Sequence, residues 1–204
     1  MELRGIDRIR TETSKMQLTP FLEQKLEHKF YLLDVDGNGV LEAADFERVI
    51  ESLAEHREWG QDDPRYLRLA TTNREFWRAL FDFCDMNEDG QVTMEEWFDF
   101  HANAVYYERR IGHEMPGVER TLGSMASFFY ELLDGDGDGV VTMDNYVDFC
   151  IAHGLVEGDA QASFALMDRN GDGLLSREEV LMLVREFYSS EDPEAPGNWF
   201  FGAL

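Results

Sequence analysis

Apolar residues recur every three or four positions along much of the chain, which is the spacing of an amphipathic helix. One such segment follows Thr19 and Pro20, which suit the N-cap and the first position of a helix. Its apolar face is formed by Phe21, Leu22, Leu26, Phe30 and Leu33. Similar faces are marked by Phe76, Leu80 and Phe83, and by Leu122, Met125, Phe129 and Leu132. The pattern therefore predicts a mostly helical protein.

Four acidic stretches that contain glycine separate the helical segments. They are DVDGNGVLEAAD (34–45), DMNEDGQVTMEE (85–96), DGDGDGVVTMDN (134–145) and DRNGDGLLSREE (168–179). In each of them Asp or Asn stands at positions 1, 3 and 5, Gly at position 6 and an aliphatic residue at position 8. This is the pattern of the EF-hand calcium loop, in which oxygens from positions 1, 3, 5, 7, 9 and 12 surround the ion. Four copies between helical segments predict four EF-hands.

The second and fourth loops have the most complete ligand sets. Position 7 contributes its backbone carbonyl, so its side chain is free to vary. The predicted ligands are Asp85, Asn87, Asp89, Gln91 and Glu96 in the second loop, and Asp168, Asn170, Asp172, Leu174 and Glu179 in the fourth. Both loops end in Glu, which binds Ca²⁺ through both of its oxygens.

The first and third loops end in weaker ligands. Their candidate ligands are Asp34, Asp36, Asn38, Val40 and Asp45, and Asp134, Asp136, Asp138, Val140 and Asn145. Asp45 is one methylene shorter than Glu and tends to bind through one oxygen, which favours Mg²⁺ as well as Ca²⁺. Asn145 offers one neutral oxygen, so the third loop is the weakest by ligand count and its occupancy is left open.

The domain organisation follows from the pairing of EF-hands, because one hand alone cannot bury its apolar face. We expect an all-α fold with four EF-hands arranged as two pairs in a compact globule, with short β-bridges between paired loops. The expected parts are an N-terminal extension (1–16), the first pair (17–111), the second pair (117–189) and an apolar tail (190–204) that packs on the core. A connection near residues 109–120 joins the two pairs.

The formal net charge of −24 narrows the range of partners. Nucleic acids and anionic membrane surfaces would be repelled, and the charge favours a monomer. The sequence has no apolar run of about 18 residues and no apolar core of a signal peptide near its start, so we expect a cytoplasmic protein. Cys84 and Cys150 are expected to be reduced and buried on helices.

The four loops, the long separation of the first two and the closing APGNWFFGAL resemble the sarcoplasmic calcium-binding protein family, including calexcitin and calerythrin. An Asp that closes the first loop, as Asp45 does, is common in that family, whereas Asn145 departs from the EF-hand pattern. The resemblance implies a compact, two-lobed helical globule that acts as a cytosolic Ca²⁺/Mg²⁺ buffer or calcium-signal protein without catalysis. It implies calcium ions as partners and leaves any protein partner unknown.

Two other functions remain open at this point. One is a calcium sensor that exposes an apolar groove to a partner, although the methionines are scattered and the apolar tail can fill such a groove. The other is a carrier of an apolar small molecule or a light-emitting oxygenase, because coelenterazine-binding proteins and calcium-regulated photoproteins share this four-hand architecture. Photoproteins need a His near the C-terminal tail, and residues 185–204 contain none.

Overall fold

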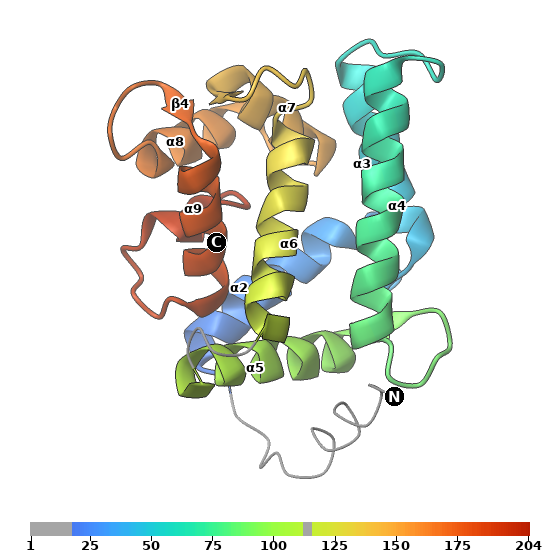
Figure 1. Cartoon of the computed structure of the whole chain (residues 1–204), viewed down its shortest axis with the longest axis vertical. Coiled ribbons are helices and arrows are strands. Elements are labelled where there is room, and N and C mark those ends of the chain that lie inside the picture. Colours follow the sequence, from blue (N-terminus) through green and yellow to red (C-terminus); the bar gives the residue numbers. More distant parts are fainter. Residues whose placement is uncertain (1–17, 112–115) are drawn as a thin grey trace.

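The computed structural model describes residues 18–111 and 116–204 (Figure 1). The helices are α2 (Pro20–Leu33), α3 (Ala43–His56), α4 (Pro64–Cys84), α5 (Met94–Ile111), α6 (Pro116–Leu133), α7 (Met143–Ala152), α8 (Glu157–Met167) and α9 (Arg177–Ser189), and a 3-10 turn, η2, spans Pro196–Trp199. The strands are β1 (Val40–Leu41), β2 (Val92–Thr93), β3 (Val141–Thr142) and β4 (Leu174–Leu175). The predicted all-α EF-hand fold is confirmed. The expected N-terminal extension (1–16) and part of the expected connection (109–120) lie outside the described residues.

Local sequence signals explain where several helices begin. The hydroxyl of Thr19 accepts a hydrogen bond from Leu22 N, and Pro20 opens α2. Ser176 caps α9 by accepting from Glu179 N, while the Glu179 carboxylate accepts from Ser176 N. The residue that closes the fourth loop is therefore also part of the N-terminal cap of the helix that leaves it.

Each pair of loops is joined by a two-residue antiparallel ladder. In β1 and β2, Leu41 lies opposite Val92, and in β3 and β4, Val141 lies opposite Leu175. These are the aliphatic residues at position 8, and each is fully buried. The first loop is thus coupled to the second, and the third to the fourth.

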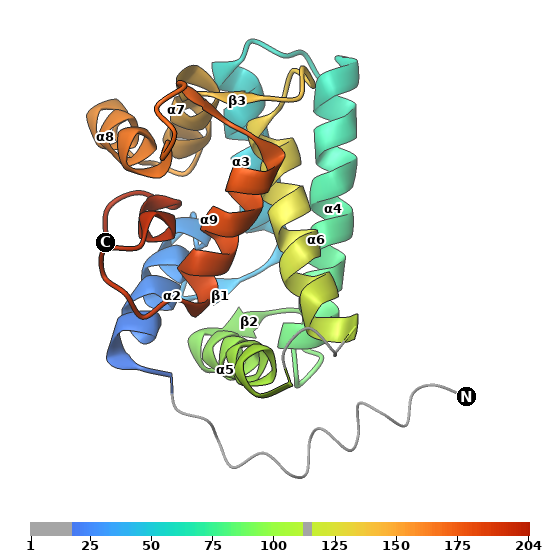
Figure 2. The ribbon, with the colours of Figure 1, turned by 60° about the vertical axis from the view of Figure 1, so that its left-hand side comes forward.

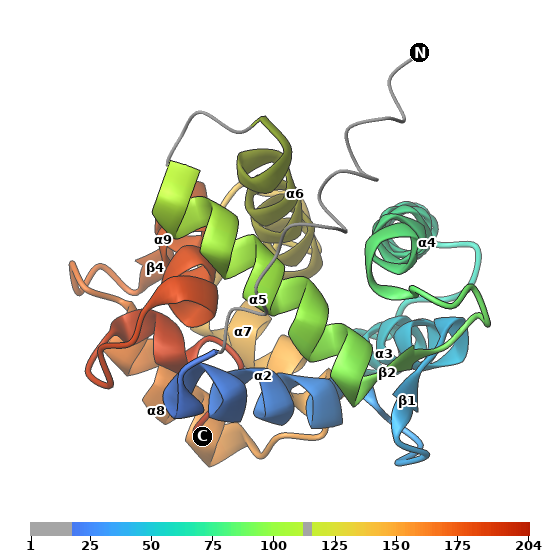
Figure 3. The same ribbon diagram turned by 90° about the horizontal axis from the view of Figure 1, so that it is seen from below.

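The helices of both pairs enclose a common hydrophobic core. In Figure 1, α3 and α4 run side by side, and α6 lies between α4 and α9. Figure 2 shows α7 and α8 together at the other end of the molecule from α5. Seen from below, α5 crosses the ends of α4, α6 and α9, with α2 beside it (Figure 3). Because α3 packs on α7 and α4 packs on α6, the first pair of hands also contacts the second directly.

Most of the predicted apolar faces are buried. Leu26, Phe30 and Phe129 are no more than 2 % exposed, and Cys84 and Cys150 are buried free thiols, as predicted. The prediction for Phe83 is wrong, since its side chain is 57 % exposed. The buried face of α4 instead runs through Leu69, Asn73, Trp77, Leu80 and Cys84. Phe83 lies one residue before Cys84 on the helix, so its side chain points about 100° away from that face.

The residues after α9 lie against the core. Phe200 and Phe201 are buried, and the ring of Phe201 lies 4.7 Å from that of Phe187 and 5.1 Å from that of Phe129. The hydroxyl of Tyr146 donates a 2.8 Å hydrogen bond to Trp199 O. These contacts connect the C-terminal segment to α6, α7 and α9.

Two lysines of α2 are buried, although lysine is usually exposed. The Lys25 ammonium donates hydrogen bonds to Glu186 O, Ser190 O and Asn198 Oδ1 at 3.2, 2.8 and 3.1 Å, and burial lowers its pKa to about 8. The Lys29 ammonium lies 4.6 to 5.4 Å from the ring centres of four aromatic residues, and burial holds its pKa well below the ordinary value. The four rings belong to Trp97, Phe129, Tyr188 and Phe201.

Within residues 18–111 and 116–204, every helix is too short or too polar to cross a lipid bilayer.

Candidate metal centres

The aspartate at position 1 is held in the same way in all four loops. Its two carboxylate oxygens accept hydrogen bonds from backbone N–H groups further along its own loop, one of them from the glycine at position 6. The glycine N to aspartate Oδ2 distances are 2.9 Å for Gly39 and Asp34, 2.9 Å for Gly90 and Asp85, 3.2 Å for Gly139 and Asp134, and 2.8 Å for Gly173 and Asp168. These glycines have φ between 81° and 89°, a conformation that suits residues without a Cβ. The loop is therefore folded around its first carboxylate.

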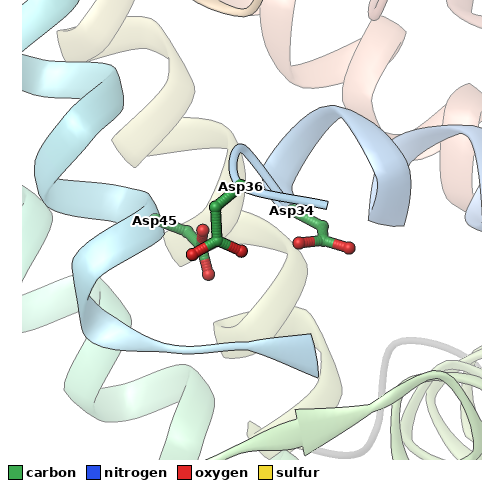
Figure 4. Close-up of side chains that lie close together, drawn as sticks. All are labelled: Asp34, Asp36 and Asp45. Carbon is green, nitrogen blue, oxygen red and sulfur yellow. The ribbon is translucent and has the colours of Figure 1, made fainter. Parts of the chain in front are cut away.

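The first loop gathers three carboxylates at the start of α3. Figure 4 shows Asp36 next to Asp45, with Asp34 beside them, and one oxygen of each lies within 4.8 Å of the others. Asp45 is fully buried; its Oδ2 accepts from Glu42 N at 3.0 Å, whereas its Oδ1 has no hydrogen-bond partner. A buried carboxylate oxygen without a donor, next to two further carboxylates, fits a hard divalent cation.

The pKa values of two carboxyl groups in the first loop, those of Asp36 and Asp45, depart from their ordinary values. Burial is the main cause that raises the pKa of Asp45, and the charges of Asp36 and Asp34 add to it. The Arg48 guanidinium, 3.0 Å from Asp36 Oδ2, lowers the pKa of Asp36. The same guanidinium lies 3.6 Å from Asp45 Oδ1. The hand thus uses one basic residue of its own exit helix to offset part of the repulsion.

In the third loop, Asp134, Asp136 and Asp138 also bring carboxylate oxygens within 4.8 Å of one another. Asp134 is buried, and desolvation is the main cause of its raised pKa. Asn145, at position 12, uses its Oδ1 to accept from Thr142 N and Thr142 Oγ1 at 2.9 and 2.8 Å. The third loop is therefore rich in carboxylates, but its closing oxygen is neutral and already accepts two hydrogen bonds.

The two loops that end in Glu keep that carboxylate engaged within the loop. Glu96 Oε2 accepts from Thr93 N and Thr93 Oγ1, and its Oε1 accepts from Met86 N at 3.1 Å. Glu179 Oε1 accepts from Asn170 Nδ2 at 3.0 Å, which brings the predicted ligands at positions 12 and 3 together. Glu96 follows β2 and Glu179 follows β4 in the chain.

Sequence reasoning missed the basic residues that contact the third loop. Arg57 follows α3 and Arg68 lies on α4, yet both guanidinium groups donate hydrogen bonds to backbone carbonyls at the third hand. The signal in the sequence is weak: the third loop has Gly135 at position 2, where the other loops carry a side chain. His101, within α5, and His153, directly after α7, are also buried.

Comparison with known proteins finds an EF-hand family match and similar calcium-binding proteins. The family described as EF hand matches residues 78–100 and 160–184, which contain the second and fourth loops. Calerythrin from Saccharopolyspora erythraea is 29% identical over 174 residues, which cover 83% of this chain and 93% of calerythrin. A sarcoplasmic calcium-binding protein from Scylla paramamosain is 26% identical over 182 residues, covering 85% of this chain and 91% of that protein.

A solved structure shares the fold. The sarcoplasmic calcium-binding protein from amphioxus superposes with a TM-score of 0.67 at 21% identity, over 92% of this chain and 100% of that one. The resemblance to the sarcoplasmic calcium-binding protein family that the sequence indicates is confirmed.

Proposed function

We propose that this chain, an EF-hand protein that resembles calerythrin and the sarcoplasmic calcium-binding proteins, binds Ca²⁺ in its loops and acts as a calcium buffer without catalysis. The observation that carries the proposal is the buried Asp45 carboxylate, whose Oδ1 lacks a donor beside Asp34 and Asp36. A bound divalent ion would add positive charge beyond that of the Arg48 guanidinium, which lies 3.6 Å from Asp45 Oδ1. Removing the ion leaves the carboxylates to repel one another, so binding should stabilise the fold.

The loops differ in the role that we propose for them. The second and fourth loops are the main Ca²⁺ sites, since each offers two Asp, one Asn, a carbonyl and a closing Glu. The first loop takes Ca²⁺ or Mg²⁺, because the shorter Asp45 suits six-fold coordination. The third loop binds most weakly, since Asn145 brings no charge. These ligand sets, like the division into two pairs at 17–111 and 117–189, stay predictions.

A buffer fits the structure better than a sensor. Phe200 and Phe201 occupy the core between α6, α7 and α9, where a sensor would open an apolar surface. We therefore expect Ca²⁺ to change the fluorescence of the apolar dye ANS very little. A large rise in fluorescence would favour the sensor instead.

The test is calorimetric titration of Ca²⁺ into chelator-stripped protein, with and without millimolar Mg²⁺. We expect heat from at least the second and fourth loops, and a rise in melting temperature that corresponds to about 2.7 kcal/mol for each occupied loop at a free Ca²⁺ concentration of about 100 times Kd. The double variant Glu96→Gln, Glu179→Gln is the control and should lose most of the heat. A wild-type protein that gives neither heat nor a shift in melting temperature would refute the proposal.

A further inference from the structure

Among the described residues, two arginines from the first pair of hands donate hydrogen bonds to carbonyls at the third loop. Arg57 Nη2 donates to Leu133 O and Asn145 O at 3.3 and 3.4 Å, and so contacts both ends of the loop. Arg57 Nε pairs with Asp148 Oδ2 on α7 at 2.9 Å, which fixes the guanidinium in place. Arg68 Nη2 donates to Gly135 O at 3.1 Å. Two positive charges from the α3–α4 region thus lie against one acidic loop.

The Arg57 side chain is buried where it contacts the third loop. It is only 8% exposed, and its Nη1 is buried without a hydrogen-bond partner. A Cβ added to Gly135 would lie 1.8 Å from Arg57 Nη1 and 2.8 Å from the Trp59 ring, so a side chain at this position would displace the guanidinium. A side chain at position 135 would therefore require the Arg57 guanidinium and the Trp59 ring to shift.

The corresponding position is open in the other loops. Position 2 is occupied there by Val35, Met86 and Arg169. Val35 and Met86 are 46% and 51% exposed. A Cβ added to Gly137 would also meet Arg68 Nη1 at 3.3 Å, whereas one added to Gly37 or Gly171, at the same position 4, would meet nothing within 4 Å.

We propose that Arg57 and Arg68 set the Ca²⁺ affinity of the third loop by acting as resident positive charges that oppose a second cation there. The inference rests on the proposed function and deepens it. A guanidinium beside the loop repels Ca²⁺ and offsets part of the carboxylate charge that would attract it. Coupling between two sites is reciprocal, so Ca²⁺ in the third loop would in turn weaken the contact between the two pairs of hands.

The structure provides a reporter for each loop. The N–H groups of Gly39, Gly90, Gly139 and Gly173 each donate to the position-1 aspartate of their own loop. A change at that carboxylate will therefore shift the amide resonance of the glycine beside it. Full-length protein made with isotope-labelled glycine can be titrated with Ca²⁺ while the amide NMR signals of the four glycines are followed separately.

The informative variant is Arg68→Gln, because Arg68 is exposed and Gln removes the positive charge while it keeps a polar side chain. We expect the Gly139 signal to titrate at about a threefold lower Ca²⁺ concentration than in the wild type, and the difference to shrink at high salt. Arg57→Gln should have a larger effect on Gly139, and it is the second variant. Arg78→Gln is the matched control, since Arg78 is exposed on the same helix about 15 Å further along.

The outcomes separate the two proposals. If Gly90 and Gly173 do not respond to Ca²⁺, the proposed function fails. If they respond, and Gly139 titrates at the same Ca²⁺ concentration in the wild type and both arginine variants, the inference is wrong. It is also wrong if Gly139 stays silent in every variant, or if Arg78→Gln matches the effect of Arg68→Gln.

Discussion

The third and fourth loops belong to one pair and share the β3–β4 ladder, yet their surroundings differ. The fourth loop closes with Glu179, and its Arg169 turns away from the loop to pair with Glu186. The third loop closes with Asn145 and is covered by Arg57 and Arg68. The loop with more aspartates is thus the one with the weaker closing ligand and the nearer positive charges. Each loop contains four carboxylates, so the number of carboxylates alone does not distinguish the two loops.

The largest expected effect comes from removing the closing ligand of the fourth loop. Glu179→Gln removes a charged bidentate ligand and should lower the Ca²⁺ affinity of that loop about a hundredfold, or about 2.7 kcal/mol. Glu178→Gln is the matched control, since it removes the same charge from an exposed neighbour. Calorimetry measures both. If both variants lose the same Ca²⁺ affinity, the difference in affinity between the third and fourth loops comes from net charge and not from coordination by Glu179.

The next effect concerns the contact between the third loop and Arg57. Gly135→Ala places a methyl group where the Arg57 guanidinium lies, so Arg57 must leave its carbonyl acceptors. We expect a loss of about 1 to 2 kcal/mol in the free energy of unfolding. Urea unfolding of calcium-free protein measures it.

Gly158→Ala is the control for this change, since a Cβ there meets nothing within 4 Å. It should change stability by less than about 1 kcal/mol, in the stabilising direction. If Gly135→Ala behaves like Gly158→Ala, the guanidinium does not pack tightly on the third loop.

A smaller effect should follow from giving the third loop the ligand of the fourth. Asn145→Glu should raise the Ca²⁺ affinity of the third loop about tenfold, or about 1.4 kcal/mol, because a charged carboxylate replaces a neutral oxygen. Met143→Glu adds the same charge at position 10 of the same loop, which is exposed and supplies no predicted ligand, and is the control. If both variants gain equally, the effect is long-range attraction and not coordination.

The smallest effect concerns how the free energy of unfolding depends on pH through a histidine beside α7, the helix that follows the third loop. His153 directly follows α7 and is buried, and burial lowers its pKa from 6.5 to about 4. The corresponding helix after the fourth loop, α9, contains no histidine. Below about pH 6.5 the unfolded chain binds a proton that the folded protein does not, so stability falls as the pH drops. Between pH 6.5 and about 5.5 this contribution is about 1 kcal/mol.

His153→Gln should remove that contribution. The measurement is urea unfolding of calcium-free protein across this pH range, with each variant compared with its own value at neutral pH. Parallel pH curves for the wild type and His153→Gln would contradict the assignment.

The sequence predicts the parts of the molecule that depend on local pattern. The glycines at position 6 and the buried aliphatic residues at position 8 follow from the loop itself, and so does the contact of Leu41 with Val92. Whether the predicted ligands bind an ion stays a prediction.

The features that the sequence did not predict depend on contacts between residues that lie far apart in the chain. The contact between Arg57 and Gly135 joins segments far apart in the chain. Lys25 and Lys29 carry charge at helix positions that the fold encloses, and Phe83 misses the buried face of α4 by one residue. Periodicity places a side chain on a helix but does not say what packs against it.

The enclosure of Lys25 and Lys29 has a practical consequence. The chain has only one other lysine, Lys15, so most of its side-chain amines are out of reach of acylating reagents while the protein is folded. Each mass increment that appears at Lys25 or Lys29 would then record an opening of the α2–α9 interface. The rate at which Lys25 and Lys29 are acylated would therefore measure how often this interface opens, without an added label.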